Sequence, residues 1–199
     1  MDLTQEFILE NNCVLLRPLK TEDCNYLQHF ALEEPEIWQY SLMPINSIAS
    51  LENYIQKALA DRDQGHSYPF IVFDKQTGKY AGATRYYDIQ PAFKTLQLGY
   101  TWYGKAFQGT GLNKHCKYLL LEFAFETLGM ERVEFRADNQ NAKSIAAMKS
   151  IGCTVEGILR SHMPNQTGGR RDSIVLSILK EAWESHVKAN LAARLTPPI

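Results

Sequence analysis

The stretch QGTGLNK, residues 108–114, separates a predicted strand, 95–103, from a predicted helix that begins at Leu112. Backbone N–H groups and the positive end of the helix dipole face outward together at such a junction, which favours an anionic ligand. Gly109 and Gly111 leave room for a pyrophosphate against the backbone, and Thr110 adds a hydroxyl donor. We therefore expect an anion-binding loop. A plain tight turn that needs glycine for its φ angles stays open as the alternative.

Two common nucleotide-binding motifs do not fit this loop. A Walker motif that starts at Gly104 needs lysine directly after Gly109, where the chain has Thr110. A dinucleotide-binding fingerprint that starts at Gly109 needs glycine at position 114, where the chain has Lys114. ATP and NAD are therefore not the expected ligands.

Outward from the loop, strand-like and helix-like segments alternate in an α/β order. Predicted strands lie at 13–19, 70–73, 80–87, 95–103, 132–137 and 172–179. Predicted helices follow Thr21, run from about 48 to Gly65 and from Leu112 to Gly129, and cover 141–151 and 180–194. We expect one domain over 1–199, with a core at 14–179 against which the C-terminal helix at 180–194 packs.

Composition narrows the class of function. The apolar share is 45%, the charged share 22% and the net charge −1, so nothing would gather the chain onto nucleic acid. The longest apolar run, 118–125, is far too short to span a membrane, and acidic residues near the start do not fit a secretory signal. A cytoplasmic location is expected. The four cysteines are scattered without ligand spacing, so we expect reduced thiols and no metal.

The order of these elements, together with the loop, resembles the GCN5-related N-acetyltransferases. The pyrophosphate loop of that family follows the pattern Gln/Arg-x-x-Gly-x-Gly/Ala between a strand and a helix. Gln108 and Gly111 match the pattern, whereas Asn113 stands where the family has a small residue. This departure implies a different contact at the phosphate.

Three further segments resemble the branch of the family that includes the ribosomal-protein N-terminal acetyltransferases. They are VLLRPL at 14–19 followed by Glu22-Asp23, EGILR at 156–160, and GRRD at 169–172. The resemblance therefore covers nearly the whole of the predicted core. It implies an α/β fold with a mixed, mostly antiparallel central sheet, flanked by helices and splayed at a wedge where acetyl-CoA binds as the acyl donor.

The resemblance also implies which residues contact acetyl-CoA. The strand 96–103 is expected to splay from the strand that begins near Arg132, so that its free backbone groups bind pantetheine. A backbone N–H near Trp102 is expected to stabilise the oxyanion that forms when an amine attacks the thioester. The expected cofactor-binding residues are Thr101, Trp102, Tyr103, Gln108, Gly109, Thr110, Gly111, Leu112, Asn113, Asn141 and Ser144.

For the catalytic step, Ser144 is expected to assist departure of the thiolate, and Asp172 to accept the proton of the amine. Some relatives carry glutamate on the central strand, but Gln97 in that region cannot act as a base. Without the resemblance, residues 141–144 would read as a helix cap and Asp172 as a turn carboxylate. A CoA-binding sensor or interaction module that has lost catalysis is the alternative function.

The acceptor is expected to be an amine, either on a protein N-terminus or on a small molecule. An acidic cluster at 33–36 would suit a cationic amine, unless it is only a solvated helix end. Four aromatic residues could add a surface for it: Trp38, Tyr40, Tyr86 and Tyr87. Neither a membrane nor nucleic acid is an expected partner, and assembly into a homodimer stays open.

Overall fold

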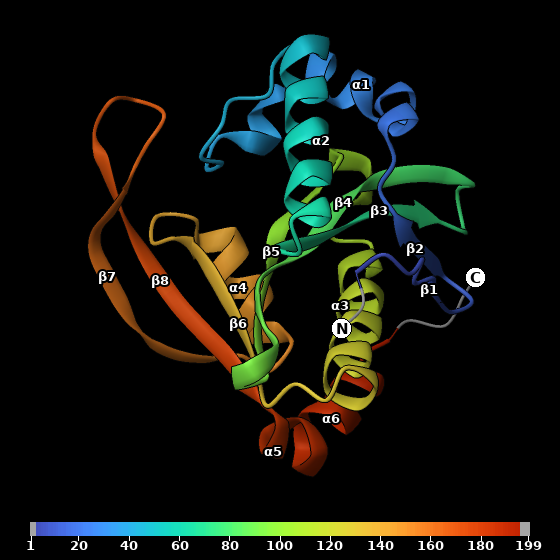
Figure 1. The fold of residues 1–199 in the computed structure, drawn as a ribbon, viewed down its shortest axis with the longest axis vertical. Helices are drawn as coiled ribbons and strands as arrows, with labels where there is room; N and C mark the ends of the chain where they lie inside the picture. Colours follow the sequence, from blue (N-terminus) through green and yellow to red (C-terminus); the bar gives the residue numbers. More distant parts are fainter. Residues whose placement is uncertain (1–2, 196–199) are drawn as a thin grey trace.

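The protein, described here from a computed structural model over residues 3–195, is built on one sheet in the order β1-β2-β3-β4-β5-β6-β8-β7 (Figure 1). The strands are β1 Leu9–Glu10, β2 Val14–Pro18, β3 Ser67–Asp74, β4 Lys79–Gln90, β5 Thr95–Tyr103, β6 Arg132–Asp138, β7 Thr154–Pro164 and β8 Arg170–Leu179. Among them only β5 and β6 pair in parallel. The predicted α/β fold with a mixed, mostly antiparallel sheet is confirmed.

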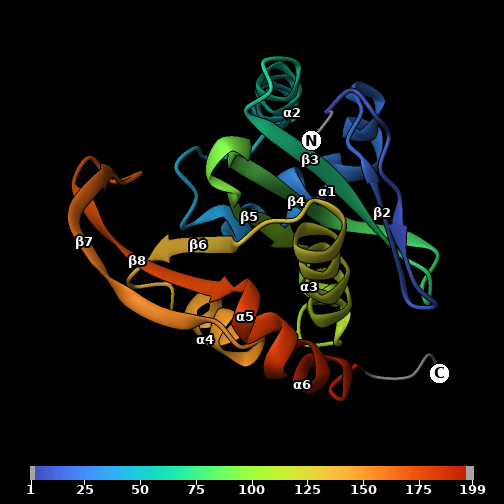
Figure 2. The same cartoon turned by 60° about the horizontal axis from the view of Figure 1, so that its bottom comes forward.

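Helices cover both faces of the sheet (Figure 2). One face carries α1 and α2, and the other carries α3, with α4 beside β6. The bounds are α1 Cys24–Glu33, α2 Ile48–Asp63, α3 Leu112–Glu122, α4 Ala142–Ser150, α5 Lys180–Ala182 and α6 Lys188–Ala192. Alternation along each strand directs large side chains into both layers, where they form a continuous apolar core. The ends of β7 and β8 project from this body as a long hairpin, hereafter the arm (Figure 1).

Most predicted elements are confirmed, and β5 agrees at both ends with the predicted strand 95–103. The strand β7 was missed because most of its residues are exposed, so burial leaves no alternating pattern in its sequence. The first predicted strand, 13–19, is present as β2 and pairs with β3 in the main sheet. The predicted C-terminal helix is interrupted by a π-helical turn at Trp183–Val187. Residues 1–2 and 196–199 of the predicted domain lie outside the described residues.

A buried ion pair joins β2 to the turn that precedes α1. The fully buried Asp23 accepts hydrogen bonds from Arg17 Nη1 at 2.9 Å and Arg17 Nη2 at 2.6 Å. Its Oδ2 also accepts from the Lys20 backbone N–H at 2.8 Å. Arg17 in turn donates to the Tyr80 hydroxyl at the start of β4. The carboxylate thereby fixes the entry to α1 against the first strands of the sheet.

We predict that Asp23→Ala lowers the free energy of unfolding by about 3 to 5 kcal/mol, because removing one partner leaves the other charge without compensation. Urea denaturation monitored by circular dichroism measures this loss. Glu22→Ala is the matched control: this neighbouring carboxylate is exposed, so the change should stay within about 0.5 kcal/mol. Equal effects of the two substitutions would contradict the role given to Asp23.

Candidate acetyl-transfer site

A wedge opens in the sheet where β5 and β6 part. The two strands pair over only three positions, the last of which joins Gln97 to Glu134. Tyr100 has a left-handed backbone with φ of 48°, and the β4–β5 register slips by one residue beside it. From this bulge onward, no strand within residues 3–195 pairs with β5 on the side of β6. The predicted splay is therefore present, and it exposes backbone groups that an extended ligand can pair with.

The glycine loop lies at the end of β5 and leads into α3. Gly109 and Gly111 have φ angles of 79° and 95°, a region that strongly favours glycine. Within the described chain the amides of Gly109, Thr110, Gly111 and Asn113 donate to no protein acceptor. The loop therefore both needs glycine for its turn and presents free N–H groups at a helix N-terminus, as an anion site requires.

Side chains of the loop tie it to its surroundings. Gln108 Nε2 donates to the Tyr103 carbonyl at 2.7 Å, and the Tyr103 hydroxyl donates to Asn113 Oδ1 at 3.3 Å. Lys143, in the first turn of α4, donates to Gln108 Oε1. This last contact crosses from the α4 side of the wedge to the loop, so it brings an ammonium to the proposed phosphate site. Lys143 was not among the residues expected to contact acetyl-CoA.

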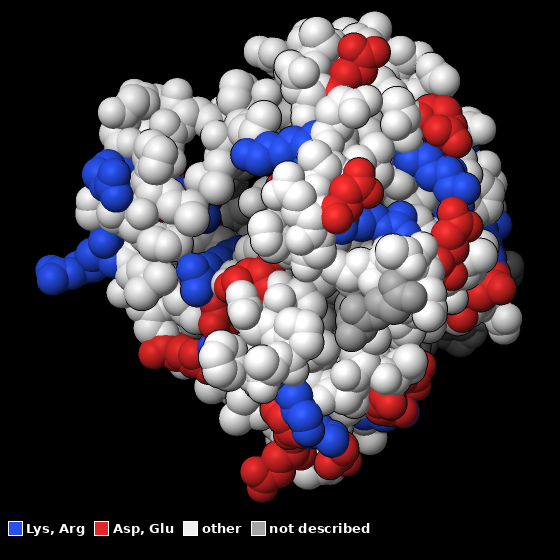
Figure 3. Space-filling model, viewed as in Figure 1, with Lys and Arg blue, Asp and Glu red and all other residues white. Residues whose placement is uncertain are grey.

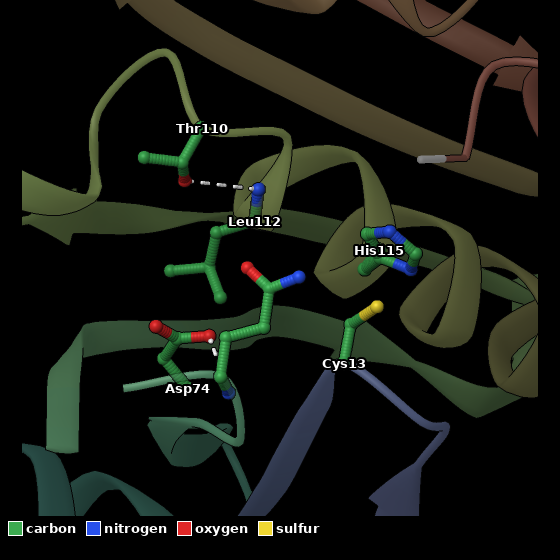
Figure 4. Close-up of a pocket in the computed structure, with 6 residues that line it drawn as sticks. Cys13, Asp74, Thr110, Leu112 and His115 are labelled. Carbon is green, nitrogen blue, oxygen red and sulfur yellow. Dashed lines mark hydrogen bonds between the residues drawn. The ribbon is translucent and has the colours of Figure 1, made fainter. Parts of the chain in front are cut away.

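A small pocket lies behind the loop, between α3 and the β2–β3 region (Figure 4). Thr110, Leu112 and His115 line it from the α3 side, and Cys13 and Asp74 line it from the other side. Within it the Leu112 N–H donates to Thr110 Oγ1 at 3.4 Å, while Thr110 Oγ1 donates to the Phe107 carbonyl. None of its lining residues belongs to β5 or β6, so this pocket is not part of the wedge.

Trp102 and Tyr103, at the end of β5, have buried side chains. Trp102 packs against Trp38, with 4.7 Å between ring centroids. Thr101 faces α3, where the buried Lys117 donates to its Oγ1 at 2.8 Å. Burial lowers the pKa of the Lys117 ammonium to about 8. The β5 contribution to a ligand in the wedge is therefore mainly that of its backbone.

On the far side of the wedge, Asn141 and Ser144 begin α4. Asn141 Oδ1 accepts a hydrogen bond from the Ser144 backbone N–H at 3.0 Å, so Asn141 is the N-cap of this helix. The half-buried Ser144 hydroxyl has no hydrogen-bond partner among residues 3–195. A capping role is thus present, and it leaves the Ser144 hydroxyl and the Asn141 amide nitrogen available.

Asp172 lies on β8, at the base of the arm. Its Oδ1 accepts a hydrogen bond from the Ser161 backbone N–H at 2.7 Å. Ser161 has a φ of 49° and sits where the β7–β8 register shifts, so the carboxylate holds a bulge in β7. By strand alternation the Asp172 side chain points to the face opposite Arg171 and Ser173. The Asp172 carbonyl accepts from the Asn139 backbone N–H at 3.0 Å, between β6 and α4. Within residues 3–195 the only hydrogen bond of the Asp172 carboxylate is the one to Ser161, so its side chain is not tied to the wedge.

Several residues that were expected to form the acceptor surface are held by contacts within the protein. Glu34 accepts from the Lys105 backbone N–H and Glu36 pairs with the Lys105 ammonium, so the acidic cluster is engaged at the β5–α3 connection. Tyr86 is fully buried and donates to the Leu120 carbonyl beneath α3. Tyr86 therefore cannot offer an aromatic surface to an acceptor, and this part of the expectation is wrong. An acceptor site at the acidic cluster 33–36 stays a prediction.

Aromatic and basic residues gather near the bulge in β5. The exposed Tyr100 contacts Tyr87, with 5.0 Å between ring centroids, and Arg85 lies 4.2 Å from the centre of the Tyr100 ring. Two sequence signals could have pointed there. Gly99-Tyr100 within a strand suggests a bulge, and Arg85 interrupts an otherwise uncharged buried stretch of β4.

Neither a membrane-spanning helix nor a group of at least three potential metal ligands occurs between residues 3 and 195.

Gln97 is buried and donates to Asp88 Oδ2 at 2.7 Å, so the amide is held as a structural donor.

Comparisons with known proteins all indicate the same family, the acetyltransferases. The sequence profile described as Acetyltransferase (GNAT) domain matches residues 14–154. The Bacillus licheniformis protein named Uncharacterized N-acetyltransferase p20 is 24% identical, over 84% of this chain and 93% of its own. Putative ribosomal N-acetyltransferase YdaF of Bacillus subtilis is 25% identical over 87% and 95%, and Spermidine N(1)-acetyltransferase of Escherichia coli K12 is 23% identical over 92% and 95%.

Solved structures share the fold. A GCN5-related N-acetyltransferase from Brucella melitensis superposes with a TM-score of 0.88 at 26% identity, covering 97% of this chain and 87% of that one. RimL, a ribosomal L7/L12 alpha-N-protein acetyltransferase solved with coenzyme A, has a TM-score of 0.77 at 18% identity, covering 88% and 99%. With the wedge and the glycine loop, these likenesses show that the chain belongs to the GNAT family of acetyl-CoA-dependent N-acetyltransferases, in the branch that resembles the ribosomal-protein enzymes.

Proposed function

We propose that the protein transfers the acetyl group of acetyl-CoA to a primary amine by direct attack, with both reactants bound together. The observation that carries this proposal is the parting of β5 and β6 beside a glycine loop with free amides. The acceptor is a protein N-terminal amine or a small-molecule amine, since the relatives include an alpha-N-protein acetyltransferase and a spermidine acetyltransferase. Holding both reactants at the wedge would supply much of the acceleration through orientation.

In this proposal the chain binds acetyl-CoA in three places. The unpaired backbone of Thr101, Trp102 and Tyr103 pairs with pantetheine as a further strand would. The amides of residues 109–113 bind the pyrophosphate, with the Lys143 ammonium beside them. Asn141 closes the site from α4, where its amide nitrogen is free to donate.

The proposed chemistry follows from the groups at the wedge. The amine nitrogen attacks the thioester carbon, and the backbone N–H near Trp102 stabilises the oxyanion that forms. The C–S bond then breaks, and the sulfur departs as a thiolate towards Ser144, whose hydroxyl donates a hydrogen bond to it. Asp172 is the proposed acceptor of the amine proton, acting directly or through water.

A covalent acetyl-cysteine is disfavoured by the environment of the cysteine nearest the loop. Cys116 is fully buried, and burial raises the pKa of its thiol to about 12. Almost none of it is therefore thiolate at neutral pH, and the thiolate is the nucleophilic form. Its neighbour His115 is buried on the α3 side of the small pocket and accepts or donates to Asn11.

The experiment that tests this function offers acetyl-CoA with peptides, polyamines and other small amines and measures release of CoA. For the best acceptor we expect initial-velocity lines that intersect, substantial activity in Cys116→Ala, and no acetylated cysteine by mass spectrometry. Parallel lines with a trapped acetyl-cysteine would overturn direct transfer. Acetyl-CoA binding without CoA release for any amine would overturn the catalytic proposal.

We predict that Gly111→Val weakens acetyl-CoA binding at least about tenfold, because a side chain enters the space of the phosphate and the left-handed φ strains it. Calorimetry measures the affinity, and circular dichroism reports the fold. Gly65→Val is the matched control, since Gly65 also has a left-handed φ, 78°, but follows α2 away from the wedge. Equal affinity losses in the two variants would remove the loop from the site.

Two substitutions at Asp172 separate its structural contact from a role as base. Asparagine can still accept the Ser161 N–H but has no basicity, whereas alanine removes both properties. A base must be deprotonated to act, so activity rises with pH through its pKa, and Asp172→Asn should flatten this acidic limb. An unchanged pH–rate profile in a folded Asp172→Asn variant would assign the proton to water or to another group.

A further inference from the structure

A hollow separates the arm from the body of the molecule on the face that carries α2 (Figure 3). The arm reaches across it to the segment that follows Pro35–Trp38. Arg171 Nη1 donates to the Tyr40 carbonyl at 3.1 Å, and Gln166 Nε2 donates to the carbonyls of Trp38 and Ser41. The hollow is therefore bounded by the arm on one side and by the segment 38–41 and α2 on the other.

Two arginines lie near the splayed part of β5, the buried Arg85 on β4 and Arg171 on the arm. From β4, the guanidinium of Arg85 stacks on the rings of Tyr54 and Tyr100, at 5.2 and 4.2 Å from their centroids. From the arm, Arg171 contacts Tyr40, two residues after Trp38, whose ring centroid lies 4.7 Å from that of Trp102 on β5. Burial raises the pKa of Tyr100, Arg85 and Arg171 act to lower it, and Tyr54 and Asp61 act to raise it. Arg171 thus lies near the end of β5 that borders the wedge, and Arg85 covers the Tyr100 ring at the bulge.

The acids near the hollow are already engaged. Asp61 lies 3.5 Å from Arg85, and Glu134 is shared between Arg132 and Arg136, at 2.7 Å from each. Asp88 accepts from Gln97 and Gln90 at the other end of β5.

Arg171, by contrast, has no carboxylate partner within residues 3–195, and it donates only to Tyr40 O and Ser173 Oγ. The Asp172 carboxylate beside it points to the opposite face of β8. Figure 3 accordingly shows basic side chains along the arm and beside the hollow. Arg171 therefore offers a positive charge that no acid of the described chain offsets.

The surroundings of His162 indicate that the electrostatic potential on this face of the arm is positive. Its Nδ1 lies 3.0 Å from the buried Ser173 Oγ. Burial lowers the pKa of His162, and Arg136, Arg171 and Arg170 lower it further, with no acid acting in the other direction. A positive potential disfavours the charged form of any amine that enters. The same field would therefore help to keep an acceptor amine neutral and nucleophilic.

From this arrangement we propose that the acceptor carries an anionic group, a carboxylate or a phosphate, close to its reactive amine, and that Arg171 binds this group. The inference rests on the proposed function, because it names the acceptor class of the same site. A polyamine would bring a second ammonium close to Arg171, which has no acid partner within residues 3–195, and to the buried Arg85. An anionic acceptor instead gains a charge-assisted hydrogen bond from a planar guanidinium.

The test uses three peptides of one length with a free N-terminal amine and glutamate, glutamine or lysine at their second and third positions. We expect kcat/KM to fall in that order, by at least about tenfold between the ends, and the difference to shrink at 1 M salt. Calorimetric binding of the same peptides to the CoA-bound protein should give the same order. This binding readout tests the charge preference even where turnover fails, so the two proposals fail separately.

Substitutions test whether Arg171 causes the preference for an anionic acceptor. We expect Arg171→Gln to reduce the glutamate-to-lysine ratio at least about tenfold and Arg171→Lys to keep part of it. Gln166→Ala removes the other contacts of the arm to 38–41 without changing charge, so it should keep the order of the three peptides. Arg194→Gln removes an arginine that bonds a backbone carbonyl far from the hollow, and it should leave kcat/KM unchanged.

β-Alanine and O-phosphoethanolamine distinguish the two anionic sources, since each carries one amine and either a carboxylate or a phosphate. Preference for either over spermidine supports the proposal and identifies the anion. The proposal is overturned when the lysine peptide or spermidine binds or reacts as well as the glutamate peptide. It is also overturned when the glutamate-to-lysine ratio of kcat/KM in Arg171→Gln equals that of the unaltered protein.

Discussion

The site depends on a parallel strand pair that stops after three residues. Up to Gln97 and Glu134, β5 and β6 hydrogen-bond as an ordinary sheet does. The left-handed backbone at Tyr100 then turns β5, and the β4–β5 register slips by one residue to accommodate it. A left-handed tyrosine costs conformational energy, of the order of 1 kcal/mol or more. The surrounding strands hold it in place, because β4 and β6 are each fixed by a further antiparallel neighbour.

The parallel direction of this pair decides where charge collects. Because β5 and β6 run the same way, the helices that follow them, α3 and α4, both begin at the open end of the wedge. Their N-termini thus place two sets of unpaired N–H groups on one side of the molecule. The contact of Lys143 with Gln108 joins the two helix starts and adds a full positive charge. A phosphate-bearing ligand is favoured there by the topology, before any single side chain is considered.

Local patterns predicted the parts of the site that local geometry determines. The strand at 95–103 and the glycine loop were both found, because alternation and left-handed φ angles leave direct marks in sequence. The acceptor surface that we propose could not be found in this way. Its charge depends on which acids have partners: Glu36 pairs with Lys105 far along the chain, while Arg171 contacts only a hydroxyl and a carbonyl within residues 3–195. Such pairings depend on the tertiary structure and cannot be predicted from composition.

Two buried cations flank the splayed part of β5 from opposite faces of the sheet. Thr84 and Arg85 are neighbours on β4, so their side chains point to opposite faces. Lys117 contacts Thr84 and Thr101 on the α3 side, whereas Arg85 stacks on Tyr100 on the α2 side. Burial opposes the charge on Lys117, lowering its pKa to about 8, yet no carboxylate neutralises it among the described residues. An anion that forms beside this strand would be stabilised from both faces by charges that are already fixed in place, without the reorganisation that water would need.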